Sequence, residues 1–333
     1  MELIEAQQVY AQHFPMTTNF ERAIFFSWSC AVNDCTFCYM STQPHVNKGI
    51  AKRTVESILA ECVITKNLGW DIGFVSGGIG VYDPKAFLEL LKKIHSIVGK
   101  VWINIGPMSK ATLQSFKPYI KGVVASVETI EPELHKKACP SKPMAPYERM
   151  LKIAQELGIP RAITFIVGLG ESRDDYALLK SFIEKYGISK IHFYGLNPVK
   201  GTVYEHTLSP TKEEQAWWIA QTRIDFPHID IQFGIWKDKI DYISTLLMAG
   251  ANAISKLPAM KCLGTTMGQR VEDEARKAGR TFRGILGDKD KIQGIDWERA
   301  VDELGFDDIL KEKVRMKVEQ YLGKLLVSAP LHA

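Results

Sequence analysis

Short apolar runs recur along the chain, and each run is followed by a stretch in which apolar residues return at helical spacing. Apolar runs bounded by turn residues indicate buried strands, whereas helical spacing indicates helices with one buried face. Eight strands are predicted, over residues 23–28, 71–76, 101–106, 122–128, 162–167, 190–196, 229–235 and 250–255. Helices are predicted between them, over residues 54–68, 84–98, 147–157, 173–186 and 211–222.

The alternation of strands and helices determines the expected fold class. Strand–helix repeats with short connections that contain glycine are typical of parallel βαβ units. Eight such units fit a closed (β/α)8 barrel of the TIM type better than a doubly wound sheet. We predict this α/β barrel over residues 1–258, with functional residues in the loops at the C-terminal ends of its strands.

After the barrel the pattern becomes mostly helical. A helical C-terminal extension is predicted over residues 259–333, where it would cover part of the barrel. Its helices are expected at residues 266–278, 297–304 and 307–326, and residues 279–296 form a charged, glycine-rich link between the first two.

Composition and charge exclude several classes of function. The chain has 46% hydrophobic and 24% charged residues, as a globular protein does. Its 42 basic and 38 acidic residues form no long block of one sign, so nothing favours a nucleic-acid partner. No apolar stretch approaches the ~20 residues of a membrane span, and the start has no secretory pattern. We therefore expect a cytoplasmic protein with no membrane partner.

Three of the six cysteines, Cys30, Cys35 and Cys38, come directly after the first predicted strand. In a reducing compartment such a cluster is expected to bind metal or to react. Thiolate sulfur is a preferred ligand of zinc and of iron–sulfur clusters. A structural zinc site takes four protein ligands, and His45 is the only candidate nearby for the fourth. A four-iron cluster on three cysteines would instead leave one iron open for a catalytic ligand.

The segment SWSCAVNDCTFCYMST, residues 27–42, resembles the cluster-binding motif of radical S-adenosylmethionine (radical SAM) enzymes. The family spacing is C-x3-C-x2-C, and here one extra residue separates Cys30 from Cys35. The resemblance implies a [4Fe-4S] cluster on Cys30, Cys35 and Cys38, with S-adenosylmethionine (SAM) on its open iron. It also implies that Phe37 packs beside the cluster and the adenine, and that SAM is cleaved to a 5′-deoxyadenosyl radical.

Segments further along the chain resemble the SAM-binding motifs of the same family, in the same order. Ser76, Gly77 and Gly78 end the second strand and match the motif for the methionine amino group, where glycine lets the backbone approach a ligand. Glu128 ends the fourth strand and matches a residue that binds a ribose hydroxyl. The combination is more specific than any one of these motifs.

Two further residues, Ile166 and Arg149, match positions of the family. In ITFIVGLGE, Ile166 matches the residue that packs on adenine, although Thr164 replaces the first glycine of the motif. Arg149 matches an arginine that binds the methionine carboxylate in the biotin synthase group, and a planar guanidinium suits that role. Apart from the resemblance, alternation along the sixth strand would turn His192 and Tyr194 toward the barrel mouth, where they could contact substrate. A core His or Tyr is equally expected at these positions, so no catalytic role is assigned to them.

Within the family, the chain resembles the biotin-synthase-like group that includes the archaeal two-subunit lipoyl synthases. The matching segments are FERAIFFSWSCAVNDCTFCYMSTQ, KKACPSKP, FYGLNPVKGT and AGANAISKLPAMK. The resemblance implies hydrogen abstraction from an octanoyl chain on a carrier protein, sulfur insertion, a paralogous partner subunit, and a ferredoxin or flavodoxin as electron donor. Biotin synthesis is disfavoured because Ile235 and Trp236 stand where that enzyme has an arginine.

Two other functions stay open. One is a radical SAM enzyme that makes the iron-guanylylpyridinol cofactor from a small molecule, and the other is a non-catalytic iron–sulfur or zinc-binding assembly protein. The remaining cysteines, Cys62, Cys139 and Cys262, could hold a second iron–sulfur cluster. Cys62 lies on an apolar helix face, however, where a buried structural thiol is the more common outcome.

Overall fold

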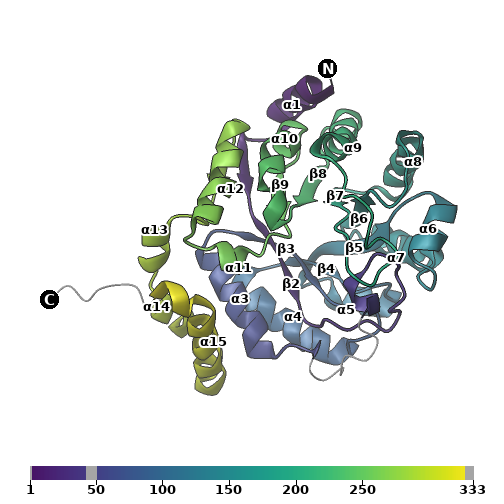
Figure 1. Ribbon diagram of the computed structural model, residues 1–333. Helices are drawn as coiled ribbons and strands as arrows, with labels where there is room; N and C mark the ends of the chain where they lie inside the picture. The colour runs from purple at the N-terminus through teal and green to yellow at the C-terminus, as the bar shows by residue number, and fades with distance from the viewer. Residues whose placement is uncertain (1, 43–50, 327–333) are drawn as a thin grey trace.

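A computed structural model describes residues 2–42 and 51–326 of the chain. Within these residues, eight parallel strands form a nearly closed barrel, and their order in the sheet is their order in the chain (Figure 1). The strands are β2 (Glu21–Phe25), β3 (Asp71–Ser76), β4 (Val101–Asn104), β5 (Ile120–Glu128), β6 (Arg161–Val167), β7 (Lys190–Gly195), β8 (Asp230–Gly234) and β9 (Ala253–Ser255). Each of the eight predicted strands overlaps one of these, so the predicted barrel is confirmed.

The barrel closes between its first and last strands through a single bridge. Each strand from β2 to β8 pairs in parallel with the next, and Phe20, just before β2, forms an isolated parallel bridge with Ile254 of β9. His45 and the rest of residues 43–50 lie outside the described residues.

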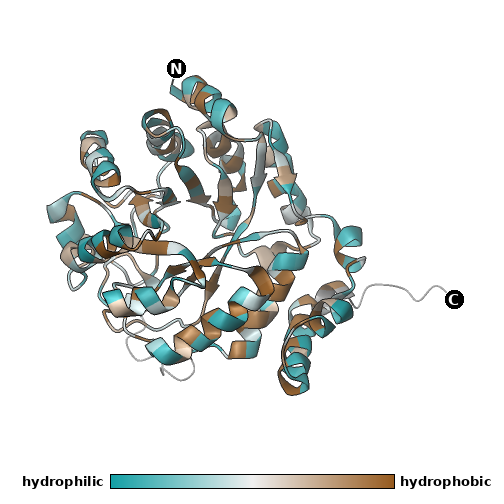
Figure 2. Ribbon diagram, turned by 180° about the vertical axis from the view of Figure 1, so that it is seen from behind, coloured by the Kyte–Doolittle hydropathy of each residue, from teal (hydrophilic) through white to brown (hydrophobic). Residues whose placement is uncertain are grey.

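Helices surround the strands and turn one face toward them. The helices that follow barrel strands are α3 (Val55–Asn67), α4 (Pro84–Val98), α5 (Lys110–Phe116), α6 (Pro132–Ala138), α7 (Met144–Glu156), α8 (Tyr176–Tyr186), α9 (Lys212–Asp225) and α10 (Ile243–Met248). In α4, for example, the buried residues recur every three to four positions, and Figure 2 shows the same two-sided pattern on the outer helices. All five predicted helices are confirmed, whereas the short helices α5, α6 and α10 were not predicted.

A strand near the N-terminus pairs with a strand of the C-terminal extension. The N-terminal helix α1 (Glu2–His13) leads to β1 (Thr17–Asn19), which forms a two-stranded parallel sheet with β10 (Thr281–Arg283). The predicted link at residues 279–296 is therefore wrong in part, because it contains β10 and the short helix α13 (Lys289–Gln293). A three-residue strand whose partner lies far away in sequence leaves no local pattern to detect.

Besides α13, the described helices of the extension are α11 (Ala259–Cys262), α12 (Thr266–Lys277), α14 (Trp297–Asp302) and α15 (Asp308–Leu326), and they include all three that were predicted. Helix α15 packs on α3 and buries Val314, Val318 and Leu322 in the same core as the barrel helices. The proposed division at residue 258 stays a prediction. No helix among the described residues has the length and apolarity needed to cross a membrane.

Candidate active site

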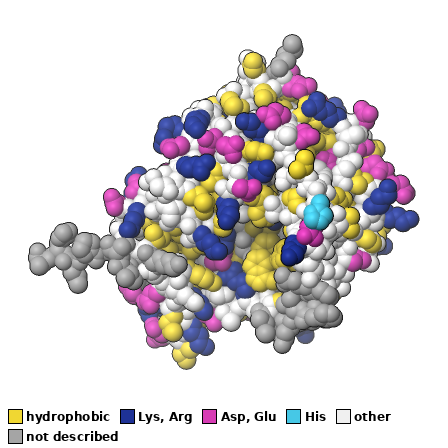
Figure 3. Space-filling model, viewed as in Figure 1, with side chains coloured by type: hydrophobic (Ala, Val, Ile, Leu, Met, Phe, Trp, Pro, Cys, Tyr) yellow, Lys and Arg dark blue, Asp and Glu magenta, His cyan; other side chains and the backbone are white. Residues whose placement is uncertain are grey.

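A cavity of about 260 Å³ opens at the C-terminal ends of the barrel strands. On the face seen in Figure 1, the surface is hollowed near its centre, with hydrophobic side chains inside the hollow and Lys and Arg side chains at its edge (Figure 3). The structure brings nine of the ten predicted site residues to this cavity: Cys30, Cys35, Phe37, Cys38, Ser76, Gly77, Gly78, Glu128 and Ile166. Its size suits a small organic molecule.

The cysteine loop lies directly on the glycine turn that follows β3. Ala31 N donates to Ile79 O at 2.8 Å, and Ile79 N donates to Cys30 Sγ at 3.3 Å. A Cβ atom at Gly78 would lie 1.9 Å from Ser29 O and 2.5 Å from Cys30 Cα. Only glycine therefore allows this contact between the two loops, and the predicted close approach at Gly78 is an approach to the cysteine loop itself.

We therefore expect Gly78→Ala to displace the cysteine loop, because both atoms that its new methyl group would meet belong to backbone. The variant should lose most of the iron that the wild-type protein binds after anaerobic reconstitution with iron and sulfide. Gly305→Ala is the matched control, since a Cβ there meets no atom within 4 Å. Equal iron content in the Gly78 variant and the wild type would show that the loop does not depend on this contact.

The extra residue between the first two cysteines is accommodated by a left-handed turn. Asn33 has φ of 50°. Asparagine adopts this conformation more readily than most residues. Cys35 and Cys38 then follow in a tight turn, in which Cys38 N donates to Cys35 O at 3.1 Å. The longer spacing therefore changes the loop and still leaves all three cysteines at the cavity.

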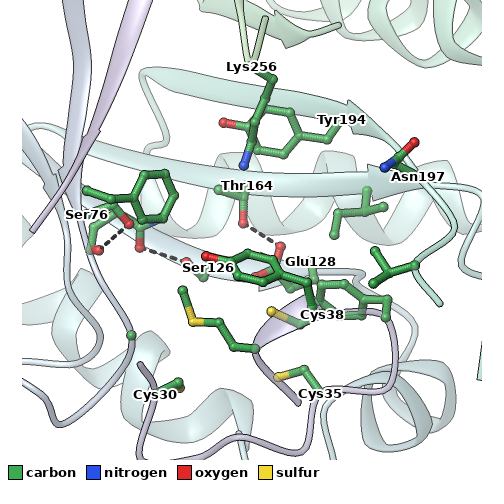
Figure 4. A pocket seen from close by; sticks show the side chains of 18 of the residues that line it. Cys30, Cys35, Cys38, Ser76, Ser126, Glu128, Thr164, Tyr194, Asn197 and Lys256 are labelled. Carbon is green, nitrogen blue, oxygen red and sulfur yellow. Dashed lines mark hydrogen bonds between the residues drawn. The ribbon is translucent and has the colours of Figure 1, made fainter. Parts of the chain in front are cut away.

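Glu128 is held at the cavity by a buried ion pair that the sequence did not predict. Lys142 Nζ donates to Glu128 Oε1 at 2.9 Å. Thr164 Oγ1 donates to Glu128 Oε2 at 2.9 Å, as Figure 4 shows. Burial opposes the charge, but Lys142 and the two hydrogen bonds outweigh it and lower the pKa of Glu128. Glu128 also has φ of 64°, which is strained for a residue with a side chain and typical of functional sites.

Thr164 stands where the family motif has glycine, and its side chain takes part in the site. Its hydroxyl fixes one carboxylate oxygen of Glu128. Thr164 lies opposite Ser126 on β5 and His192 on β7, and the register with β5 shifts directly after it, between Ser126 and Glu128. The threonine therefore adds a hydrogen bond at the site, next to an irregularity in the pairing of β5 with β6. His192, by contrast, is fully buried in the barrel and contacts Gln232, so it does not reach the mouth.

Arg149 is the one predicted site residue that the structure does not bring to the cavity. It is exposed on α7, whose buried face is formed by Tyr147, Met150, Leu151 and Ala154. Helical periodicity turns Arg149 away from the barrel, because it lies between the positions that face the core. The cation that reaches the site from this region is Lys142, which precedes α7 and lines the cavity.

A second polar group was also missed. Asn104, at the end of β4, links the neighbouring strand ends: its carbonyl accepts from Ser76 Oγ at 3.0 Å and its side-chain Oδ1 accepts from Ser126 Oγ at 2.7 Å. All three residues line the cavity. The signal in the sequence was a polar residue close to the C-terminal end of the predicted strand 101–106, where a TIM-type barrel carries its functional groups.

Comparison with known proteins decides the family. Residues 29–183 match the family described as the Radical SAM superfamily. The chain belongs to the radical SAM family. The predicted resemblance to biotin-synthase-like radical SAM enzymes is thereby confirmed, and membership implies a [4Fe-4S] cluster and SAM as cofactors.

Three proteins illustrate the similarity. An uncharacterized protein of Methanocaldococcus jannaschii is 35% identical over 97% of this chain and 93% of its own. A biotin synthase of Coxiella burnetii is 26% identical over 66% of this chain and 71% of its own. Among solved structures, methylornithine synthase has a TM-score of 0.71 at 21% identity and covers 87% of this chain and 91% of its own, which shows a shared fold. Other curated relatives are matched over about half of their own length.

The residues at the cavity fit the cluster of a radical SAM enzyme. Cys30, Cys35 and Cys38 supply three soft sulfur donors on one loop that faces an open cavity, which is the donor set of a cluster with one free iron. In the described part of the chain, no three His, Cys, Asp or Glu side chains converge closely enough to hold a single metal ion. The closed four-ligand geometry of structural zinc is thus absent from the described residues.

The predicted second cluster gains no support, because its three cysteines lie on separate elements. Cys62 is buried on the inner face of α3, Cys139 ends α6 beside Cys35, and Cys262 lies in α11, where its sulfur contacts Met267. All three are almost completely buried. They are placed as core thiols on different elements, and none faces the cavity with the radical SAM motif.

Proposed function

We propose that this radical SAM enzyme binds SAM in the cavity at the barrel mouth and removes a hydrogen atom from an aliphatic C–H bond of a second substrate held beside it. The observation that carries the proposal is the placement of Cys30, Cys35 and Cys38 on one wall of a cavity. The other walls bring together the motif residues for SAM and a set of apolar side chains. The residues proposed for the radical source and the apolar side chains proposed for its target thus line the same cavity.

When bound, the cluster supplies the electron that cleaves SAM to methionine and a 5′-deoxyadenosyl radical. The chain itself binds and orients. We infer that the backbone at Gly77 and Gly78 lies against the methionine group, that Glu128 accepts from a ribose hydroxyl, and that Ile166 and Phe37 pack on the adenine. A ferredoxin or flavodoxin is the electron donor that we propose.

The cavity walls also serve to exclude water. Apolar side chains from several strands or their loops line it, among them Phe25, Phe74, Ile79 and Trp236. Unactivated C–H bonds are beyond acid–base catalysis, so a cofactor radical has to carry the step, and the protein contributes by positioning the carbon. An apolar wall suits the hydrocarbon part of a substrate.

The substrate that the sequence resemblance favours is an octanoyl chain on a lysine of a carrier protein, with sulfur inserted at the carbon that loses hydrogen. A mobile acyl chain can enter the mouth while its protein anchor stays outside. This supports a lipoyl synthase component, and the partner subunit would perform the other half of the reaction. The apolar wall is compatible with this substrate.

One observation favours a second candidate, a small-molecule substrate as in iron-guanylylpyridinol cofactor biosynthesis. Lys256 lines the same cavity. A cation within the cavity suits a substrate that brings its own anionic group, whereas an octanoyl amide carries no charge.

The test uses anaerobically reconstituted protein, a reductant, SAM and an octanoylated carrier peptide that carries deuterium at carbons six and eight. We expect 5′-deoxyadenosine to form and to contain deuterium, from only one of the two carbons if a partner handles the other. Arg149→Ala should behave like wild type, because Arg149 is exposed and lies outside the cavity.

The possible failures differ in meaning. SAM cleavage without deuterium transfer, with the partner present, would contradict the octanoyl substrate and favour the small-molecule candidate. No SAM cleavage by protein that has bound iron and sulfide would contradict the assignment of this cavity as the radical SAM site.

A further inference from the structure

Lys256 has a strained backbone at the edge of the active site. It follows β9 directly and has φ of 65°, in the left-handed region that residues with long side chains rarely adopt. Such conformations persist where the surroundings fix them, and they concentrate at ligand-binding positions. At Lys256 the conformation places a long basic side chain in the wall of the cavity.

The neighbouring strands make room for this side chain. Gly234 ends β8, and a Cβ atom there would lie 2.7 Å from Lys256 Cγ and 2.3 Å from Tyr194 Cδ1. Glycine at this position therefore allows Lys256 and Tyr194 to pack together. The ammonium group lies 4.8 Å from the centre of the Tyr194 ring and 5.7 Å from that of Phe25, within the range of cation–π attraction.

Within residues 2–42 and 51–326, the ammonium group of Lys256 has no anionic partner. Among the residues that the structure describes, none accepts a hydrogen bond from it or forms an ion pair with it. Glu128 is the carboxylate that attracts it, but both oxygens of Glu128 are already bound, one by Lys142 and one by Thr164. Burial lowers the pKa of Lys256, and Glu128 and Cys38 only partly offset that effect. Two rings alone are a weak substitute for an anion around a half-buried cation.

We propose that Lys256 binds an anionic group, a carboxylate in the first instance, on the second substrate. The inference rests on the proposed function, in that this cavity is taken as the site of the reaction. SAM also carries a carboxylate, but the predicted SAM residues belong to β3, β5 and β6, whereas Lys256, Tyr194 and Gly234 belong to β7, β8 and the end of β9. Figure 4 shows Lys256 across the cavity from Cys30 and Cys35.

The proposal specifies the class of substrate. Its anionic end would lie between Tyr194 and Phe25 on the far wall, and its aliphatic part would extend toward the cysteine loop, past the apolar side chains between them. A free carboxylic acid has this form, and an acyl chain in amide linkage to a lysine does not. Lys256 therefore favours a small carboxylate over a carrier-bound acyl group.

The test compares two probes of the same shape, octanoate and octanamide, by anaerobic calorimetry on the reconstituted enzyme with SAM present. Wild-type protein should bind octanoate roughly ten- to hundredfold more tightly than octanamide, the effect of one charge-assisted contact. Lys256→Met keeps the stem, removes the charge and should bind the two probes alike, and Lys256→Arg should keep a preference for octanoate. Lys237→Met is the matched control, since Lys237 is exposed near the same end of the barrel and does not line the cavity.

A second measurement tests whether the charge of Lys256 destabilises the folded protein when no ligand is bound. Lys256→Met should raise the midpoint of thermal unfolding of the protein without probe, because it removes a half-buried charge that has no anionic partner among the described residues, and Lys237→Met should not. A lower midpoint for Lys256→Met would show that the charge is already compensated, and would count against the proposal.

The remaining outcomes show whether Lys256 binds the carboxylate of the second substrate or that of SAM. Equal affinity of wild type for octanoate and octanamide, or an octanoate preference that persists in Lys256→Met, would overturn the proposal. So would a loss of SAM affinity in Lys256→Met with the octanoate preference intact, because Lys256 would then serve SAM. The octanoate preference is measured without turnover, so an enzyme that binds octanoate through Lys256 yet never cleaves SAM would contradict only the proposed function.

Discussion

Replacing Cys30, Cys35 and Cys38 together with alanine is expected to abolish the binding of iron and sulfide by the anaerobically reconstituted protein. The reason is that these residues supply the three thiolates at the cavity, and the other cysteines are buried on separate elements. Iron and acid-labile sulfide analysis, together with the visible absorption of the cluster, measures the effect. SAM cleavage should disappear in parallel.

The matched control replaces Cys62 and Cys262 with alanine, which removes thiols of the same kind from the core. This variant should keep its iron and sulfide, although it is expected to unfold somewhat more easily. Full retention of iron and sulfide in the triple variant would refute the assignment of the cysteine loop. One zinc and no sulfide in the wild-type protein would support a non-catalytic zinc module instead.

Lys142→Met is expected to lower the free energy of unfolding by about 3–5 kcal/mol at neutral pH, the usual effect of removing one partner of a buried ion pair. The side chains of Lys142 and Glu128 are 5% and 13% exposed, so solvent cannot replace the lost partner. Anaerobic unfolding in urea measures the change. Lys142→Met combined with Glu128→Gln should recover part of the loss, since no unpaired carboxylate then remains.

The pH dependence of the free energy of unfolding tests whether the Lys142–Glu128 ion pair stabilises the folded protein. The pKa of Glu128 is lowered in the folded protein, so its stabilising contribution is present above the ordinary pKa of a glutamate and is lost as the pH falls through the lowered value. In Lys142→Met, Glu128 stays buried but has lost the cation that pairs with it. Its pKa would therefore rise, and the carboxyl would take up a proton at higher pH. The difference in the free energy of unfolding between the wild type and Lys142→Met should therefore become smaller as the pH falls. A constant difference would contradict the role assigned to the pair.

The barrel and most of the site could be predicted because both have a local signal. Buried parallel strands are short apolar runs, and the functional residues follow directly after them: Cys30 after β2, Ser76 at the end of β3 and Glu128 at the end of β5. Once the order of the strands is known, the topology alone brings these residues to one mouth.

The sequence predictions failed where the outcome depends on the direction of a side chain or on pairing between distant segments. Arg149 and Lys142 are both basic and only seven positions apart, and the sequence alone did not show that the helix turns one outward while the loop before it turns the other inward. Lys256 lines the cavity through a left-handed backbone that leaves no signal in composition. Strands β1 and β10 each have three residues and depend on each other across most of the chain.

That last pairing has a consequence for how the protein is made. Strand β1 is synthesised early, but among the described residues its only strand partner is β10, at Thr281–Arg283. During translation β1 therefore waits, unpaired, until the barrel and part of the extension have left the ribosome. Contacts between such distant segments form late and slowly. The ladder between β1 and β10 thus forms only after most of the chain has been translated, whereas helix α1, which packs on α9 and α10, can join the barrel earlier.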